Sequence, residues 1–325
     1  MAKTDTKERI INYIQNNGEV TPHELNMHLN ISAQAMYRHL KQLIQSGCII
    51  KVGASPRVFY KILDEKENKE DSLVSKEDEI FLDKYFYYVS PIGKGYEGVS
   101  AMKKWCERQS LPLKKTINEY RKTILKYDKY KTDERINGIE KIKQTFKEAS
   151  LDELYYFDFY AIERFGKTKL GYYLLYSKQG QSLSYMKKLI NEIKPLIKRL
   201  IKDKKIDGIA FVPPTVKREL QIMKLIEKEC QFNLRVLKVE KLKTEIIVPQ
   251  KTLSKLNDRI INARDTMIIR EKSHFNRVLL IDDAVGSGAT LNEISKQMKD
   301  KNVCNHVIGC AITGSFKGFD ILNEV

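Results

Sequence analysis

The sequence predicts an α/β protein in which a parallel sheet covered by helices follows a small helix-and-hairpin domain and a helical connector. Strand and helix patterns alternate in the last part of the chain, which is typical of a parallel sheet between helices. A compact run of helices and one hairpin comes first, in a chain of 325 residues that is 42% apolar. We expect four parts: a first domain at 1–63, a charged linker at 64–79, a helical connector of unknown role at 80–150, and the α/β domain at 151–325.

The first domain is predicted from apolar spacing and helix caps. Ile10 and Ile14 share one helix face, and Thr21 followed by Pro22 and Glu24 is a helix-start pattern with a capping box. A third helix begins after Ser32 and ends at Gly47, where a hairpin with a Gly-Ala-Ser-Pro tip follows. We expect helices at 6–16, from 22 and at 33–46, and strands at 48–52 and 57–62.

The next 90 residues carry weaker signals. Residues 64–79 are dominated by charge and have little to bury, which predicts a linker. An aromatic stretch at 81–89 is followed by Pro and Gly, and two Lys-rich stretches at 113–130 and 133–148 have a helical pattern. We interpret this region as a helical connector with a solvated basic face.

The α/β domain begins near Tyr155. An amphipathic helix is expected at 184–202, with Leu189, Ile193, Leu196 and Leu200 as its apolar stripe. Further helices are expected at 217–228 and 290–298. We expect strands at 155–165, 170–176, 206–212, 236–239, 277–281 and 303–312.

Composition narrows the class of protein. The formal net charge is +16, which favours polyanionic partners, although Lys-rich chains also arise from AT-rich genomes without functional meaning. No stretch approaches the ~20 apolar residues of a membrane helix. The first residues lack the apolar core of a signal peptide, so we expect a cytoplasmic protein without membrane contact. Five scattered cysteines predict neither a disulfide framework nor a zinc site.

The most informative segment is 278–291. Four apolar residues form a buried strand, and Asp282 and Asp283 follow at the end where α/β sheets bind ligands. Two glycines then let backbone N–H groups approach one anion, at a helix start whose dipole favours negative charge. Two adjacent carboxylates suit the two hydroxyls of a sugar diol. We predict that Asp282 and Asp283 bind ribose and that its phosphate is bound by Val285, Gly286, Ser287, Gly288, Ala289 and Thr290.

Three other interpretations fit this segment less well. A P-loop has Lys after its last glycine, where this chain has Ala289. A dinucleotide-binding loop has its acidic residue about 20 residues after the glycines, not directly before them. A purely structural acidic turn would not require the strand, the acids, the glycine spacing and the helix start to agree.

The segment resembles the signature of type I phosphoribosyltransferases, although that family usually has hydroxyl residues where Val285 and Gly286 stand. The resemblance implies a parallel sheet of that family's kind and a ligand such as phosphoribosyl diphosphate, bound with Mg²⁺ and without a metal site made by protein alone. It also implies a pyrophosphate-contacting region at Pro213, Pro214, Lys217 and Arg218. The pattern of Gln250, Leu253, Arg259 and Asn262 resembles the ComF branch of the family.

The helices and hairpin of the first domain resemble a winged helix-turn-helix. In this class the second helix of the pair enters the DNA major groove and the wing contacts the backbone. The alternative is a winged helix used for protein contacts or dimerisation. The groove candidates are Ser32, Gln34, Ala35, Tyr37 and Arg38, and the wing candidates are Lys51 and Arg57.

Three functions follow as hypotheses. The first is a DNA-binding transcription regulator whose second domain binds phosphoribosyl diphosphate or a nucleotide, an architecture that resembles purine-operon repressors. The second is a catalytic phosphoribosyltransferase, of the glycosyltransferase class, with an unknown acceptor base. The third is a ComF-like protein of DNA uptake. Whether the chain forms a homo-oligomer is left open.

Overall fold

The computed structural model describes residues 6–54, 57–62, 74–242, 244–246 and 248–315. The chain forms two compact units, Met1–Lys122 and Thr123–Val325. The division between them falls inside helix α7 (Leu113–Asp128). Among the described residues no helix combines the length and the apolar character needed to cross a membrane.

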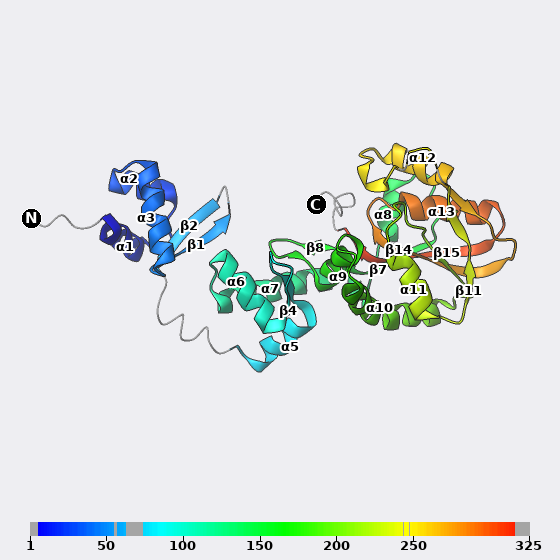
Figure 1. The fold of residues 1–325 in the computed structure, drawn as a ribbon, viewed down its shortest axis with the longest axis horizontal. Helices are drawn as coiled ribbons and strands as arrows, with labels where there is room; N and C mark the ends of the chain where they lie inside the picture. The colour runs from blue at the N-terminus through cyan, green and yellow to red at the C-terminus, as the bar shows by residue number, and fades with distance from the viewer. Residues whose placement is uncertain (1–5, 55–56, 63–73, 243, 247, 316–325) are drawn as a thin grey trace, which may run out of the picture. The chain divides into compact units, whose positions relative to one another are not determined.

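The N-terminal part has three helices and a hairpin, as predicted (Figure 1). The Thr21 hydroxyl accepts a hydrogen bond from the Glu24 N–H, and the Glu24 carboxylate accepts one from the Thr21 N–H, which completes the predicted capping box. Ser32 caps the third helix by accepting from the Ala35 N–H at 3.2 Å. The elements are α1 (Thr6–Asn17), α2 (Pro22–Leu29), α3 (Ala33–Gln45), β1 (Ile49–Ala54) and β2 (Arg57–Ile62).

The remainder of the first unit is a separate group of short elements. The expected linker at 64–79 is shortened by α5 (Lys76–Tyr85), because Ser75 caps that helix by accepting from the Asp78 N–H at 3.1 Å. Residues 64–73 of that linker lie outside the described residues. The aromatic stretch supplies β3 (Tyr87–Val89), which pairs with β4 (Gly95–Glu97), and α6 (Gly98–Gln109) follows.

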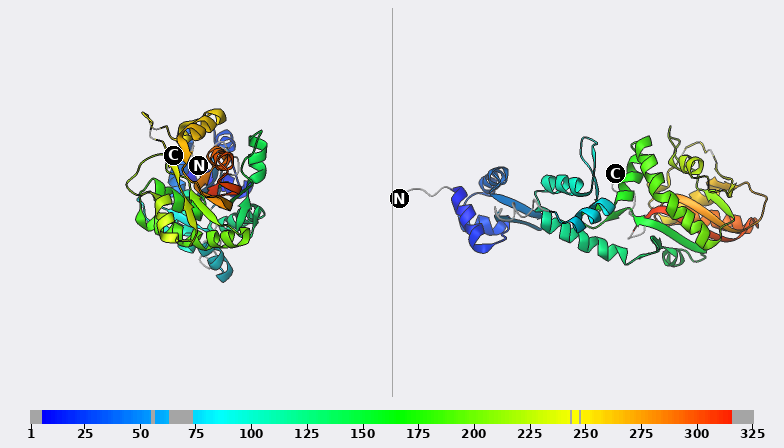
Figure 2. Two further views of the ribbon diagram at one scale, coloured as in Figure 1. Left: turned by 90° about the vertical axis from the view of Figure 1, so that its right-hand side faces the viewer. Right: turned by 90° about the horizontal axis from the view of Figure 1, so that it is seen from below.

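The second unit contains a seven-stranded sheet in the order β11-β10-β14-β15-β7-β6-β5. The first five of these strands pair in parallel, which confirms an α/β fold with a mainly parallel sheet (Figures 1 and 2). They are β11 (Arg235–Leu237), β10 (Gly208–Phe211), β14 (Phe275–Val285), β15 (Cys304–Gly314) and β7 (Glu153–Phe159).

Two antiparallel strands close the edge of this sheet next to β7. They are β6 (Arg135–Asn137) and β5 (Lys131–Thr132), and β6 pairs with β7 through Ile136 and Tyr156. The prediction of a continuous helix at 133–148 is therefore wrong, because only α8 (Ile139–Thr145) is helical there. Ile136 lies in the extended strand β6, and its side chain is buried, with 3% of its surface exposed.

Helices pack around the sheet. A predicted strand at 170–176 is wrong: this segment lies in α9 (Lys169–Lys178), which begins because the Thr168 hydroxyl accepts from the Gly171 N–H at 3.1 Å. The other helices are α10 (Leu183–Lys204), α11 (Ile222–Cys230), α12 (Leu256–Thr266) and α13 (Ala289–Asp300), with a 3₁₀ turn η1 (Gln250–Thr252). Short pairs complete the unit: β8 (Ala161–Ile162) with β9 (Gly166–Lys167), and β12 (Val239–Lys241) with β13 (Met267–Ile269).

Strand β14 is the centre of the core. Residues Val278 to Ile281 are fully buried, which explains why they form an unbroken apolar run: a parallel strand covered on both faces has no polar side. The strand continues four residues beyond its predicted end, since Ala284 pairs with Thr313 and Val285 with Gly314 on β15. The acidic pair therefore lies within the paired strand and not in a free loop.

Candidate functional site

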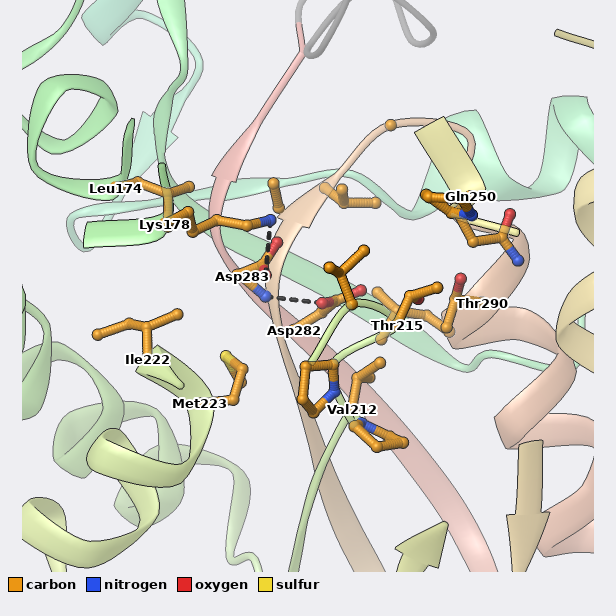
Figure 3. A pocket seen from close by; sticks show the side chains of 18 of the residues that line it. Leu174, Lys178, Val212, Thr215, Ile222, Met223, Gln250, Asp282, Asp283 and Thr290 are labelled. Atoms are coloured by element: carbon orange, nitrogen blue, oxygen red, sulfur yellow. Dashed lines mark hydrogen bonds and ion pairs between the residues drawn. The ribbon is translucent and has the colours of Figure 1, made fainter. Parts of the chain in front are cut away.

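A pocket of about 220 Å³ lies in the second unit at the carboxyl end of β14. Its walls come from β14 and the loop that follows, from residues 212–216 after β10, from α9 and α11, and from the segment around η1. Figure 3 shows the acidic pair of β14 near the middle of these walls. Parallel strands bring such loops together because their carboxyl ends meet at one edge of the sheet.

The acidic pair makes two polar contacts in the pocket. The Asp283 backbone N–H donates to Asp282 Oδ1 at 2.7 Å, and the Lys178 ammonium lies 2.8 Å from Asp283 Oδ2. Both contacts are drawn in Figure 3. Lys178 comes from the end of α9, a segment that contributed nothing to the sequence-predicted site. The structure therefore adds a cation to the two carboxylates.

The Asp282 carboxyl group lies in surroundings that favour its protonated form. Burial, and then the negative charge of Asp283, raise the pKa of Asp282 to about 7. The Lys178 charge and the Asp283 N–H act in the opposite direction and do not compensate. At neutral pH the Asp282 carboxyl therefore holds a proton for much of the time and can donate as well as accept a hydrogen bond.

The glycine loop joins the acidic pair to α13. All six residues predicted to bind phosphate, from Val285 to Thr290, line the pocket. Gly288 stands directly before the first residue of α13. Its φ of +79° is a backbone conformation that a residue with a Cβ rarely adopts. The loop therefore delivers a helix N-terminus to the pocket, where backbone N–H groups and the helix dipole favour an anion.

The predicted pyrophosphate region is only partly in the pocket. Pro213, Pro214 and Arg218 line it, whereas Lys217 is exposed and does not. The Arg218 guanidinium donates to the Lys178 carbonyl oxygen at 2.5 Å, so it fixes the end of α9. Lys178 lines the pocket and Lys217 does not.

Residues of the predicted Gln–Leu–Arg–Asn pattern come together beside the loop. Gln250 Nε2 donates to Asn262 Oδ1 at 3.2 Å and to the Arg259 carbonyl at 3.0 Å, and Arg259 Nε donates to the Leu253 carbonyl at 2.7 Å. Gln250 and Arg259 line the pocket, and burial lowers the pKa of Arg259. Figure 3 shows Gln250 on the Thr290 side of the pocket.

Apolar side chains also line the pocket, on the other side of the acidic pair. Leu174, Ile222 and Met223 face this part of the pocket in Figure 3, on the side away from Thr290. One cavity thus has a glycine loop at one end, two carboxyl groups in the middle and an apolar surface at the other end. That division of polar and apolar walls is typical of sites for small organic ligands.

The described residues contain no group of three or more His, Cys, Asp or Glu side chains that could hold a metal ion. Of the described residues that line the pocket, two carry carboxyl groups, and one of these is paired with Lys178. Mg²⁺ needs few protein ligands when a substrate phosphate supplies the others. Asp282 and Asp283 are therefore the carboxyl groups of the described lining that would approach a magnesium ion, and its other ligands would come from outside the protein.

The predicted DNA-contacting residues are distributed over α3 and the hairpin. Gln34, Tyr37 and Arg38 are exposed on α3, and Tyr37 is 51% exposed although it is aromatic. Ser32 is also exposed but its oxygen caps the helix, and Ala35 is partly buried. On the hairpin Lys51 is exposed, whereas the side chain of Arg57 lies outside the described part of the chain.

Comparison with known proteins identifies the N-terminal region of the chain. Residues 3–50 match the family model described as winged helix-turn-helix DNA-binding. No curated protein matched the chain.

Solved structures gave a weaker result. A crystal structure of adenine phosphoribosyltransferase is 14% identical, with 44% of this chain and 78% of that chain covered and a TM-score of 0.28. At this TM-score the likeness supports no assignment of function.

Proposed function

We propose that the chain is a DNA-binding regulator whose α/β unit binds a ribose 5-phosphate ester, either phosphoribosyl diphosphate or a nucleotide. The observation that carries this proposal is the pocket, in which Asp282 and Asp283 stand directly before a glycine loop at a helix N-terminus. The same chain begins with a winged helix-turn-helix. A regulator that responds to a ligand needs both a DNA-binding domain and a small-molecule site, and this chain offers a candidate for each.

The ligand assignment follows from the chemistry of the walls. A ribose diol can bind the two carboxyl groups, since Asp282 can donate or accept and Asp283 accepts. A 5-phosphate can then lie against the N–H groups of the loop. Lys178 keeps donors beyond the one near Asp283 and can bind a second anionic group of the ligand. Mg²⁺ would be brought in with a diphosphate and would neutralise its charge.

The DNA assignment depends on the exposed face of α3. Gln can pair with adenine, and Arg can bind guanine or phosphate, so Gln34 and Arg38 supply suitable groups for a major groove. Tyr37 lies between them in sequence with half of its surface open to solvent. The net charge of +16 favours the approach of a polyanion.

A mobility-shift experiment tests the regulator. The full chain is titrated onto DNA from upstream of its own coding region at physiological salt, with and without phosphoribosyl diphosphate and Mg²⁺. We expect specific binding whose affinity changes with the ligand. Binding no tighter than that of a basic control protein removes the DNA assignment, and specific binding that no ribose phosphate changes removes the sensor.

A catalytic phosphoribosyltransferase is the second candidate, and the apolar wall favours it. Leu174, Ile222 and Met223 form a surface against which the ring of an acceptor base can pack. The test is release of pyrophosphate from phosphoribosyl diphosphate, screened over nucleobases. Robust turnover with any base would support the enzyme hypothesis and contradict the sensor hypothesis.

The ComF-like alternative depends on one cluster. Gln250, Arg259 and Asn262 are linked by hydrogen bonds beside the loop, as residues of one functional pattern would be. A strain without the protein tests this role. Normal transformation and recombination in that strain would remove the support for it.

A further inference from the structure

The glycine loop at 285–290, which we call the ribose-phosphate loop, packs on its other side against residues 139–151, which we call the brace. It comprises α8 and the residues that lead from it to β7. Neither Ile142 of the brace nor Asn292 of α13, which faces it, lines the pocket. Any effect of the brace on a ligand must therefore pass through the loop.

The brace touches the glycine of the loop directly. A Cβ added to Gly288 would lie 2.1 Å from Ile142 Cδ1, so the Ile142 side chain occupies the space where any other residue would place its own. Ile142 is 1% exposed. The loop therefore lies between the ligand pocket and a buried, closely packed side chain.

Hydrogen bonds attach the first turns of α13 to the brace. Asn292 Oδ1 accepts from the N–H groups of Ser150 at 2.9 Å and Leu151 at 3.3 Å. The Ser295 hydroxyl donates to the Ser150 carbonyl at 2.7 Å. Both α13 side chains are buried, Asn292 at 3% and Ser295 at 0% exposure. Buried polar groups are costly without partners, so these bonds hold α13 in one register against the brace.

The other end of the loop is attached as well. The Lys141 ammonium donates to the Ser315 carbonyl at 3.0 Å, and the Ser315 N–H donates to the Val285 carbonyl at 3.3 Å. The brace therefore contacts the loop at Gly288 and reaches Val285 through one residue. Both ends of the phosphate-binding turn are fixed by one segment.

We propose that Ile142 and Asn292 are positioning residues that set the geometry of the ribose-phosphate loop and through it the affinity for the phosphorylated ligand. The proposal rests on the proposed function for the identity of the ligand, but the support of the loop does not depend on it. Binding an anion with backbone N–H groups needs those groups fixed before the ligand arrives, and their positions depend on the residues packed behind them.

The test compares two equal deletions in the full chain. Ile142→Ala removes the contact with Gly288, and Ile193→Ala removes the same atoms from α10, where Ile193 is also fully buried and does not line the pocket. Calorimetry with ribose 5-phosphate and with phosphoribosyl diphosphate measures binding. Hydrogen exchange of the peptide that contains 286–290 measures the loop without ligand.

We expect Ile142→Ala to raise the Kd by about tenfold or more, since misplacing a binding group by an ångström can cost more than that. Its loop amides should exchange faster than in the wild type. Ile142→Val, which removes only the Cδ1 methyl beside Gly288, should change both properties in the same direction and by less than Ile142→Ala does. Asn292→Ala should behave like Ile142→Ala. Ile193→Ala should lower the melting temperature while leaving the Kd and the loop exchange close to wild type.

The outcomes separate the two proposals. If the wild type binds neither ligand, the proposed function fails, and loop exchange alone decides the role of the brace. If Ile142→Ala leaves loop exchange unchanged, or changes it no more than Ile193→Ala does, the brace is ordinary core and the proposal is overturned. Unchanged affinity in Ile142→Ala, where the wild type binds, has the same consequence.

Discussion

Replacing Asp282 by Asn should stabilise the free protein at alkaline pH and weaken ligand binding at the same time. The pKa of this carboxyl lies at about 7 in the fold, against 3.8 for an ordinary Asp. The unfolded chain therefore releases its proton at lower pH than the folded chain does. The wild type loses stability as the pH rises from 3.8 through about 7, whereas the amide of the Asp282→Asn variant has no proton to lose in this range.

The magnitude follows from the two pKa values. Their difference corresponds to about 4 kcal/mol at about 1.4 kcal/mol per pH unit. Asp282 lines a pocket that water can enter, so we expect about half of this, roughly 2 kcal/mol, for the gain of Asp282→Asn at pH 8. At pH 4 the difference should be close to zero. The Asn side chain keeps an oxygen that can accept from the Asp283 N–H, so the local geometry is preserved.

Urea unfolding at pH 4 and pH 8, followed by circular dichroism, measures the stability, and calorimetry with phosphoribosyl diphosphate and Mg²⁺ measures binding. At pH 8 the Asp282 carboxyl is ionised, and charge-assisted hydrogen bonds are worth roughly 1.5–3 kcal/mol, so the Kd measured at that pH should rise at least about tenfold. Equal stability of variant and wild type at pH 8 would falsify the raised pKa. Wild-type affinity in the variant would refute the binding of ribose by this carboxyl.

Lys178→Ala should raise the Kd for phosphoribosyl diphosphate, measured by calorimetry, by about tenfold or more, because a charge-assisted contact is lost. Replacing the exposed Lys187 by Ala is the control and should change the Kd little. Equal effects of the two substitutions would exclude a direct contact between Lys178 and the ligand. Gly288→Ala should destabilise the chain by roughly 2–4 kcal/mol in urea titrations, since it combines a positive φ with overpacking, and a neutral effect contradicts the described loop. Arg38→Ala should reduce the salt dependence of DNA binding by about one in the log–log slope, measured by fluorescence anisotropy, and the same loss in the Lys103→Ala control would show a non-specific charge effect.

The strand, glycine turn and helix start of 278–290 could be predicted because their residues are contiguous. An apolar strand, two acids, two glycines and a helix start follow one another from Val278 to Thr290, and local rules describe each of them. The capping box of Thr21 and Glu24 was predictable for the same reason, since a side chain and its backbone partner lie three residues apart.

Lys178 could not be predicted in the same way, since its partner Asp283 is about 100 residues further along the chain. The wrong prediction of a strand at 170–176 also hid the position of Lys178 relative to the pocket. The aromatic side chains of this segment are typical of strands, whereas Thr168 starts a helix there. With the helix in place, Leu174 and Lys178 are four residues apart on one face, and both line the pocket. That spacing was the available signal.

The short strands β5 and β6 limit how the α/β unit can be moved into another protein. They cover β7, whose edge would otherwise expose unpaired N–H and carbonyl groups. A fragment that begins at residue 151, as sequence patterns alone suggest, would lose this cover together with α8 and the contact at Gly288. A transplantable ligand-binding module has to begin before Lys131, so that the edge of the sheet and the back of the loop travel with it.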